Sequence, residues 1–165
     1  MRESVGSTWI FALAISFTLI FSGFLVLVLS YSKAYKLKNE MTSIIEKYEG
    51  ITTNDKLNNK GSLSIINQYL YNSGYNAVGH CDVGSYGVDD LLSDTIVQIT
   101  DANKNQDYYY CLKTNTSKSS CTTLFTITVF YDFNLPFFGQ LKKYSISGQT
   151  NEIYKAYLNN IQIVC

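Results

Sequence analysis

The chain has 165 residues, enough for one compact domain and an appendage, and its 13 basic and 13 acidic residues give zero net charge. This balance gives no electrostatic reason to expect nucleic acid as a partner. Fourteen Tyr, nine Phe and a single Pro favour β-strands, because aromatic side chains suit a pleated, half-buried surface.

The N-terminal region contains an uncharged apolar run from Trp9 to Leu29, WIFALAISFTLIFSGFLVLVL. A helix of about 20 apolar residues spans the hydrocarbon core of a bilayer. The run therefore predicts a transmembrane helix at residues 9–30, preceded by a short segment at residues 1–8. A buried helix of a soluble domain and a cleaved signal peptide are the alternatives, although signal peptides usually have an apolar region of only about 7–15 residues.

Residues 31–49 continue the helical period with an apolar face. That face consists of Ala34, Leu37, Met41, Ile44, Ile45 and Tyr48. No Gly or Pro interrupts the stretch before Gly50, which is a natural residue to follow a helix end. We expect one helix from about Ser7 to Glu49, with a lipid-facing half and an amphipathic extension at 31–49, followed by an extracytoplasmic domain at 50–165.

The charges around the apolar run and the cysteines predict opposite orientations of the chain in the membrane. Arg2 and Glu3 precede the run, whereas Lys33, Lys36 and Lys38 follow it, and the positive-inside rule would place the lysines in the cytoplasm. The cysteines indicate an oxidising compartment on that side. We follow the cysteines, because the lysines belong to an amphipathic helix that continues into a domain. The predicted location is the cell membrane, with one span and the C-terminal domain outside.

All four cysteines lie on the C-terminal side of the run: Cys81, Cys111, Cys121 and Cys165. No CxxC pair is present, and His80 directly precedes Cys81, so the two would point to opposite faces of a strand. We therefore expect two disulfides rather than a metal site, with unpaired thiols as the alternative. Of three possible connectivities we favour Cys81–Cys111 with Cys121–Cys165; a Cys111–Cys121 bridge would instead clamp a hairpin.

The remaining segments predict an α+β domain. Residues 62–73 have helical spacing, with Ser62 as N-cap and Gly74 as the stop. Residues 51–61 and 82–94 are expected to be loops. Strands are expected at 95–100 and 107–113, joined as a hairpin through a turn at 101–106. The tail, 151–165, is compatible with a strand or a short helix.

The clearest strand is 122–135, in which apolar and mostly polar residues alternate. The apolar set is Phe125, Ile127, Val129, Tyr131, Phe133 and Leu135. Pro136 is expected to end this strand, and residues 141–147 form another. A sheet with one apolar face needs a cover, and the amphipathic half of the first helix is the natural one.

This layout resembles the pilin fold of type IV pili, type II secretion pseudopilins and tight-adherence pili. The stretch from Glu3 to Trp9 is similar to the start of TadE-like pseudopilins, and Val129 to Thr150 is similar to the C-terminal sheet of pilus-related proteins from Gram-positive bacteria. The resemblance implies a structural subunit whose protruding helix is held in a membrane and then packs against other pilin-like subunits. Small residues would permit that close packing: Ala12, Ala14, Ser16, Ser22 and Gly23.

The N-terminus departs from the pilin pattern. Pilins carry a leader that a peptidase removes, and a Glu at the fifth position of the mature helix. Here no basic leader precedes the run, and Glu3 is the only nearby acid. Either the chain is a processed form or it is not a peptidase substrate. Glu3 would neutralise the N-terminal amine of a neighbouring subunit if it acts as in pilins; the alternative, which we favour, is a solvated residue at headgroup level.

Catalysis is not expected, and neither is a cofactor. His80 lies in a Gly-rich segment without a GxSxG motif. The acidic residues between Asp82 and Asp94 do not have the spacing of an EF-hand loop, so a solvated acidic loop is the preferred interpretation. The alternative function is a membrane-anchored extracellular binding or sensor module, or an accessory protein of an envelope machine, in which the span is a simple tether.

Overall fold

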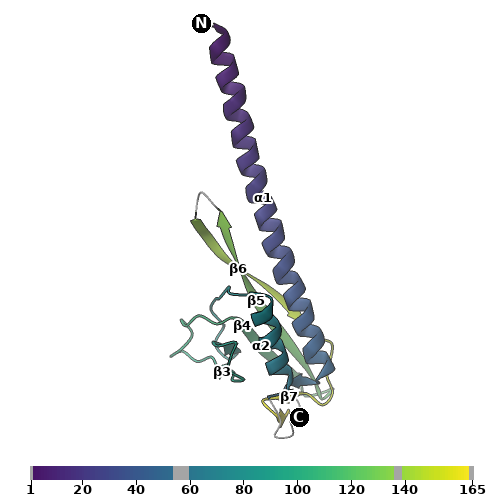
Figure 1. The fold of residues 1–165 in the computed structure, drawn as a ribbon. Coiled ribbons are helices and arrows are strands. Elements are labelled where there is room, and N and C mark those ends of the chain that lie inside the picture. Colours follow the sequence, from purple (N-terminus) through teal and green to yellow (C-terminus); the bar gives the residue numbers. More distant parts are fainter. Residues whose placement is uncertain (1, 54–59, 136–138, 164–165) are drawn as a thin grey trace.

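The computed structural model describes residues 2–53, 60–135 and 139–163, and the side chains of 8–53, 60–132 and 143–163. The chain is α+β, with one long N-terminal helix, a short second helix and antiparallel strands, which confirms the predicted fold class. Helix α1 (Arg2–Lys47) has 46 residues and is therefore roughly 69 Å long. It begins earlier than the expected start near Ser7, and its N-terminal half projects away from the rest of the chain (Figure 1).

The C-terminal half of α1 covers the sheet. Met41 and Ile45 are both 0% exposed, Ala34 and Leu37 are also buried, and Ile44 packs against the same core. Burying a side chain of this size contributes about 1.5–3 kcal/mol. The buried positions follow the predicted helical spacing, so the amphipathic extension is the cover that the sheet requires.

Helix α2 (Ser62–Asn72) follows the short strand β1 (Gly50–Ile51). The prediction of Ser62 as N-cap is wrong: the N-cap is Gly61, which has no side chain to cap the helix. The Ser62 hydroxyl instead donates to the Gly50 carbonyl at 2.8 Å and accepts from the Thr52 N–H at 2.9 Å. Ser62 is buried, so its hydroxyl ties α2 to the chain leaving α1. Gly74, at φ 63°, follows the helix end as expected.

The main sheet has the strand order β3-β2-β4-β5-β6. Its strands are β2 (Tyr86–Val88), β3 (Val97–Gln98), β4 (Tyr110–Ser117), β5 (Thr122–Leu135) and β6 (Gly139–Gln149). Two expectations are wrong. Residues 82–94 are not only loop, because β2 lies within them, and β3 pairs with β2 rather than with β4. Strand β2 therefore separates the two segments expected to form a hairpin.

Strand β5 has the predicted bounds and the predicted alternation. Phe125, Ile127 and Val129 are 0% exposed and belong to the core, whereas Tyr131 is half-buried. The side chains of Phe133 and Leu135, and the whole of Pro136, lie outside the described residues. Strand β5 pairs with β4 through Thr122–Val129 and with β6 through Thr126–Leu135, so β4 and β6 flank it in the sheet.

A second small sheet joins the end of α1 to the C-terminal tail. Strand β1 pairs in parallel with β7 (Tyr157–Leu158), which pairs with β8 (Ile161–Gln162). The tail therefore contributes short strands rather than a helix. Gly50 has φ 133°, and a Cβ there would collide with the backbone of Tyr157, so this close approach requires glycine.

Two buried tyrosine hydroxyls connect the loops to the core. The Tyr110 hydroxyl donates to Asn67 Oδ1 at 2.8 Å, and Asn67 Nδ2 donates to the Ser93 carbonyl at 2.8 Å. The Tyr75 hydroxyl donates to the Phe130 carbonyl at 2.8 Å and accepts from the N–H of the same residue at 2.9 Å. Burial raises the pKa of both tyrosines above the ordinary value of 10.0. Both hydroxyls therefore stay neutral and bonded.

Candidate functional site: the anchor helix and the disulfide-bonded sheet

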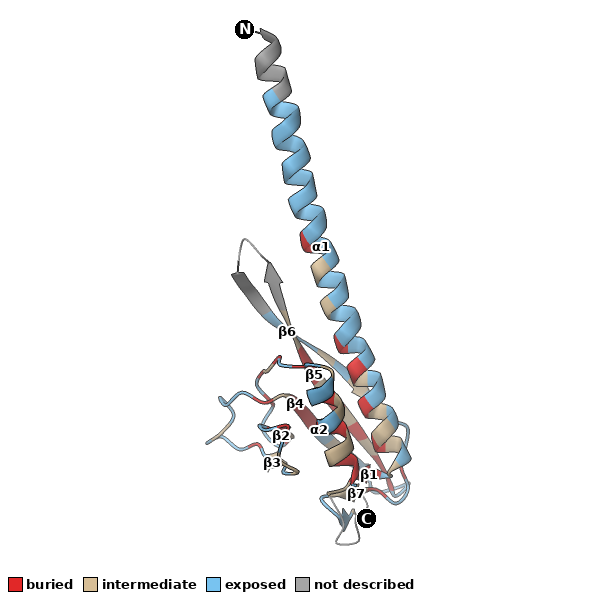
Figure 2. Cartoon of the chain, viewed as in Figure 1, coloured by how far each residue is buried: buried red, intermediate tan, exposed pale blue. Residues whose placement is uncertain are grey.

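The N-terminal half of α1 is an exposed apolar surface. Trp9, Phe17 and Ile20 are 73%, 67% and 71% exposed, and residues 8–22 form a continuous exposed segment that ends at the buried Gly23 (Figure 2). Between Thr8 and Lys47, α1 contains an 18-residue window with a mean hydropathy of 2.5, so it is long and apolar enough to cross a membrane. Since a soluble chain rarely exposes a large contiguous apolar patch, this half requires an apolar environment other than the domain's own core.

The predicted assembly residues all lie on α1, but they do not share one face. At about 100° per residue, Ala12, Ser16 and Gly23 fall within about 40° of one another. We call these three the small-residue stripe. Ala14 and Ser22 fall on other sides of the helix. The side chain of Glu3 lies outside the described residues, so its role stays a prediction.

Where α1 leaves the apolar run, four tyrosines meet; we call Tyr31, Tyr35, Tyr131 and Tyr144 the tyrosine cluster. The ring of Tyr31 stacks with that of Tyr35 at 6.3 Å and meets that of Tyr131 edge-on at 6.1 Å. Tyr131 of β5 in turn stacks on Tyr144 of β6 at 5.5 Å. Burial, followed by the neighbouring Tyr31 and Tyr144, raises the pKa of Tyr131. The cluster fixes the height of α1 against the β5–β6 pair.

A cavity of about 200 Å³ lies beside the cluster, between α1 and β5. Lys33 and Asp132 are among its lining residues, and Asp132 Oδ1 is buried without a protein hydrogen-bond partner among the described residues. A polar cavity of this size can hold water molecules. Charged groups therefore begin on both elements at this level, immediately beyond the end of the apolar run.

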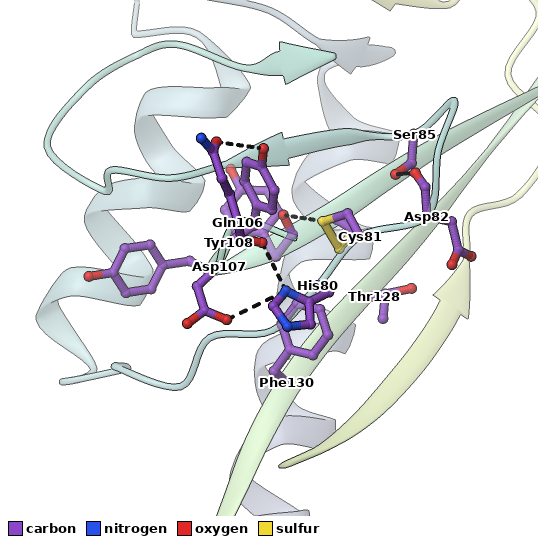
Figure 3. The surroundings of a disulfide bond; sticks show 12 residues. His80, Cys81, Asp82, Ser85, Gln106, Asp107, Tyr108, Thr128 and Phe130 are labelled. Atoms are coloured by element: carbon purple, nitrogen blue, oxygen red, sulfur yellow. Dashed lines mark hydrogen bonds and ion pairs between the residues drawn. A yellow bond between two sulfur atoms is a disulfide. The ribbon is translucent and has the colours of Figure 1, made fainter. Parts of the chain in front are cut away.

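The disulfide between Cys81 and Cys111 joins the loop before β2 to strand β4 (Figure 3). Both cysteines are buried, and they are 30 residues apart in the chain. This bridge confirms one predicted pairing and excludes the alternative Cys111–Cys121 bridge. Cys121 is also disulfide-bonded, but Cys165 lies outside the described residues, so the Cys121–Cys165 pairing stays a prediction. Disulfides of this kind are typical of extracytoplasmic domains.

The outer face of the sheet is polar. An open concavity of about 420 Å³ lies over β4, β5 and β6, and its lining includes Thr128, Ser147 and His80. The hydroxyls of Thr128 and Ser147 are 2.8 Å apart. Nearby, Lys143 Nζ donates to Asp107 at 3.1 Å. His80 Nδ1 lies 3.7 Å from the same carboxylate (Figure 3). These groups are exposed and cross-link the edge of the sheet.

The described residues contain no group of three or more His, Cys, Asp or Glu side chains that could hold a metal ion. In the acidic segment, the Asp90 carboxylate accepts from the Leu92 N–H at 2.9 Å, which is a local turn contact. His80 Nδ1 lies 3.0 Å from the Gln106 carbonyl oxygen, to which its N–H donates in the tautomer protonated at Nδ1. The contacts of Asp90 and His80 are thus those of turns and strand edges.

Comparison with known proteins finds no matching family model, no matching curated protein and no matching solved structure.

Sequence reasoning missed the tyrosine cluster, although a signal was present. Tyr31 and Tyr35 directly follow the apolar run at a four-residue spacing, and tyrosines at the end of such a run are typical of the membrane–water interface. Tyr131 and Tyr144, their partners on β5 and β6, had no such signal. No local sequence pattern specifies how α1 aligns with strands that are distant in the sequence.

Proposed function

We propose that the chain is a non-enzymatic, membrane-anchored subunit of the pilin kind, resembling the TadE-like pseudopilins of tight-adherence pili, in a surface pilus or secretion apparatus. One observation carries the proposal. A single unbroken helix serves two environments: its N-terminal half exposes apolar side chains, and its C-terminal half covers the sheet of the same domain.

The anchoring part of the proposal follows from that helix. An exposed apolar segment of this length is stable in lipid. The Cys81–Cys111 disulfide favours an oxidising compartment for the domain, and hence an outside location for residues 50–165. Protease added to intact cells should then degrade the domain; a domain that survives until lysis would contradict this orientation.

The assembly part of the proposal depends on the small-residue stripe. Small residues on one face let a second helix approach closely in an apolar environment. Ala12, Ser16 and Gly23 supply such a face, whereas Ala14 and Ser22 lie elsewhere on α1. The predicted partners are therefore other copies or other pilin-like subunits, packed helix against helix.

The experiment is to shear intact cells and to measure the chain in the sheared high-molecular-weight material and in the membranes. The chain without substitutions should be recovered in the sheared material. Gly23→Leu should reduce that recovery about tenfold for each ~1.4 kcal/mol of packing lost, whereas the neighbouring Ser22→Leu, on another face, should not. Recovery only in membranes would favour an anchored accessory or sensor protein instead.

A further inference from the structure

The cavity between α1 and β5 is bounded by three segments that are far apart in the sequence. Its walls are α1 between Ser30 and Leu37, residues 75–77 after α2, and residues 130–132 of β5. Its volume is about 200 Å³, which is below the ~300–1,000 Å³ of pockets for drug-sized ligands. The cavity therefore suits a small polar group rather than an extended ligand.

Asp132 supplies a carboxylate oxygen to this cavity that no described protein group satisfies. Its Oδ1 atom is buried and has no hydrogen-bond partner among the described residues. Tyr75, which also lines the cavity, donates its single O–H to the Phe130 carbonyl at 2.8 Å. An ionised carboxylate only accepts hydrogen bonds, and buried polar groups are normally paired. Asp132 therefore requires a donor from outside the described part of the chain.

Lys33 brings the opposite charge to the cavity from α1. Its side chain is exposed, and neither Lys33 nor Asp132 forms an ion pair among the described residues. Two opposite charges thus line one cavity without pairing with each other. A ligand that carries both an anionic and a cationic group satisfies the two residues together, whereas a simple ion satisfies only one of them.

The cavity begins where the apolar run of α1 ends. Its lining residue Ser30 directly follows Leu29, and Leu37 lies about 10 Å further along the helix than Ser30. The headgroup layer on each side of a bilayer is about 5–8 Å thick, since ~30 Å of hydrocarbon lies within ~40–45 Å overall. The tyrosine cluster lies at the same level, as tyrosines at a membrane–water interface do. The cavity is therefore at the level of the lipid headgroups around the proposed anchor.

We infer that the cavity binds the headgroup of phosphatidylethanolamine. The primary ammonium of this lipid has three N–H donors and donates to Asp132 Oδ1, while Lys33 donates to the phosphate. A choline headgroup has no N–H to donate, and a phosphatidylglycerol headgroup brings no positive charge to the carboxylate. This inference rests on the proposed anchoring by α1, which brings the cavity to lipid. The bound headgroup joins α1 to β5 at the bilayer surface.

The test measures which lipid the full chain retains. The protein is reconstituted in vesicles that contain equal amounts of phosphatidylcholine, phosphatidylethanolamine and phosphatidylglycerol with the same acyl chains. It is then extracted in mild detergent, and the retained lipid is identified by native mass spectrometry. The variants are Asp132→Asn and Lys33→Gln. The matched controls are Glu40→Gln and Lys36→Gln, which are exposed on α1 and do not line the cavity.

Phosphatidylethanolamine should be retained in preference to the other two lipids. Each cavity variant should lower its retention about tenfold, as expected for the loss of one hydrogen bond to a charged group, and the controls should not. Near-ultraviolet circular dichroism checks the fold of Asp132→Asn, and Lys33→Gln, at an exposed position of α1, tests the site independently.

Equal retention of the three lipids, by a chain that stays with the vesicles in alkali, overturns the inference and leaves the anchor intact. Release of the chain by alkali overturns the anchor and the inference together. Preferential retention of phosphatidylglycerol that survives Asp132→Asn assigns the cavity to an anionic group at Lys33 and overturns the inference. Retention of added free phosphoethanolamine, without retention of the lipid, assigns it to a soluble ligand and also overturns it.

Discussion

The first half of α1 is far more apolar than the second, and the apolar side chains of the two halves have opposite exposure. Phe17 and Ile20 are 67% and 71% exposed, whereas Met41 and Ile45 are 0% exposed. In the first half apolar residues surround the helix; in the second they are confined to one face, with Lys and Glu on the other. A helix that is apolar all round suits lipid, and one with a stripe suits a protein core. One continuous helix thus suits two environments through the composition and the pattern of its two halves.

The largest expected effect is a difference between the two halves of α1 in their contribution to the stability of the domain. Met41→Ala leaves a cavity under the sheet and should lower the free energy of unfolding by about 2–5 kcal/mol. Phe17→Ala removes a side chain that contacts no core residue and should change it by less than about 0.5 kcal/mol. Denaturant unfolding in detergent, followed by near-ultraviolet circular dichroism, measures both. Equal losses would show that the apolar half is part of the folded core.

The disulfide should affect the stability of the domain and not the membrane anchoring by α1. Replacing both Cys81 and Cys111 by Ala releases a loop of 30 residues and should lower the free energy of unfolding by about 3–4 kcal/mol. Membrane retention of the same variant should be unchanged, because α1 has no part in this bridge. A variant that leaves the membrane would show that anchoring needs the folded domain.

A charge in the apolar half of α1 should weaken membrane anchoring rather than the stability of the domain. Ile20→Lys places an ammonium near the middle of the run and should disfavour insertion by about 2.5–3.5 kcal/mol. Ser32→Lys, exposed and beyond the run, is the control. The fraction of chain that resists alkaline extraction from membranes should fall for the first and not for the second. Retention of both would indicate attachment by something other than α1.

The smallest expected effect is a loss of domain stability at high pH. The pKa of Tyr75 is raised by burial above 10.0, so the unfolded chain loses that proton first. Its stabilising contribution is complete below pH 10 and falls above it, by up to about 1.4 kcal/mol per pH unit. Tyr75→Phe should flatten the fall measured by denaturant unfolding between pH 10 and pH 11. An unchanged slope would mean that other groups cause the fall.

Local periodicity predicted the elements that are long or strictly patterned. The bounds of β5 and the helical face through Met41 and Ile45 could be read from the sequence, because burial on one side imposes a period of 2 or 3.6. Strand β2 could not, since its three residues lie in a Gly- and Asp-rich segment and are held by pairing with β3 and β4. The tyrosine cluster depends in the same way on contacts between distant segments.

For the candidate site, the apolar run predicted a helix long and apolar enough to span a membrane, and the cysteine count predicted a disulfide. The pairing of Cys81 with Cys111 was one of three possibilities that spacing alone does not separate. Which small residues share a face followed from helix geometry once α1 was continuous.

The parallel pairing of β1 with β7 has a consequence for the order of events in folding. Thr53 N–H donates to Asn160 Oδ1 at 3.0 Å across 107 residues of chain, and the Tyr157 N–H donates to the Glu49 carbonyl. The base of the helix therefore acquires its last hydrogen bonds only when the C-terminal residues have been synthesised. Contacts of such long sequence separation form late, so these hydrogen bonds at the helix base form only after Tyr157 and Asn160 have been synthesised.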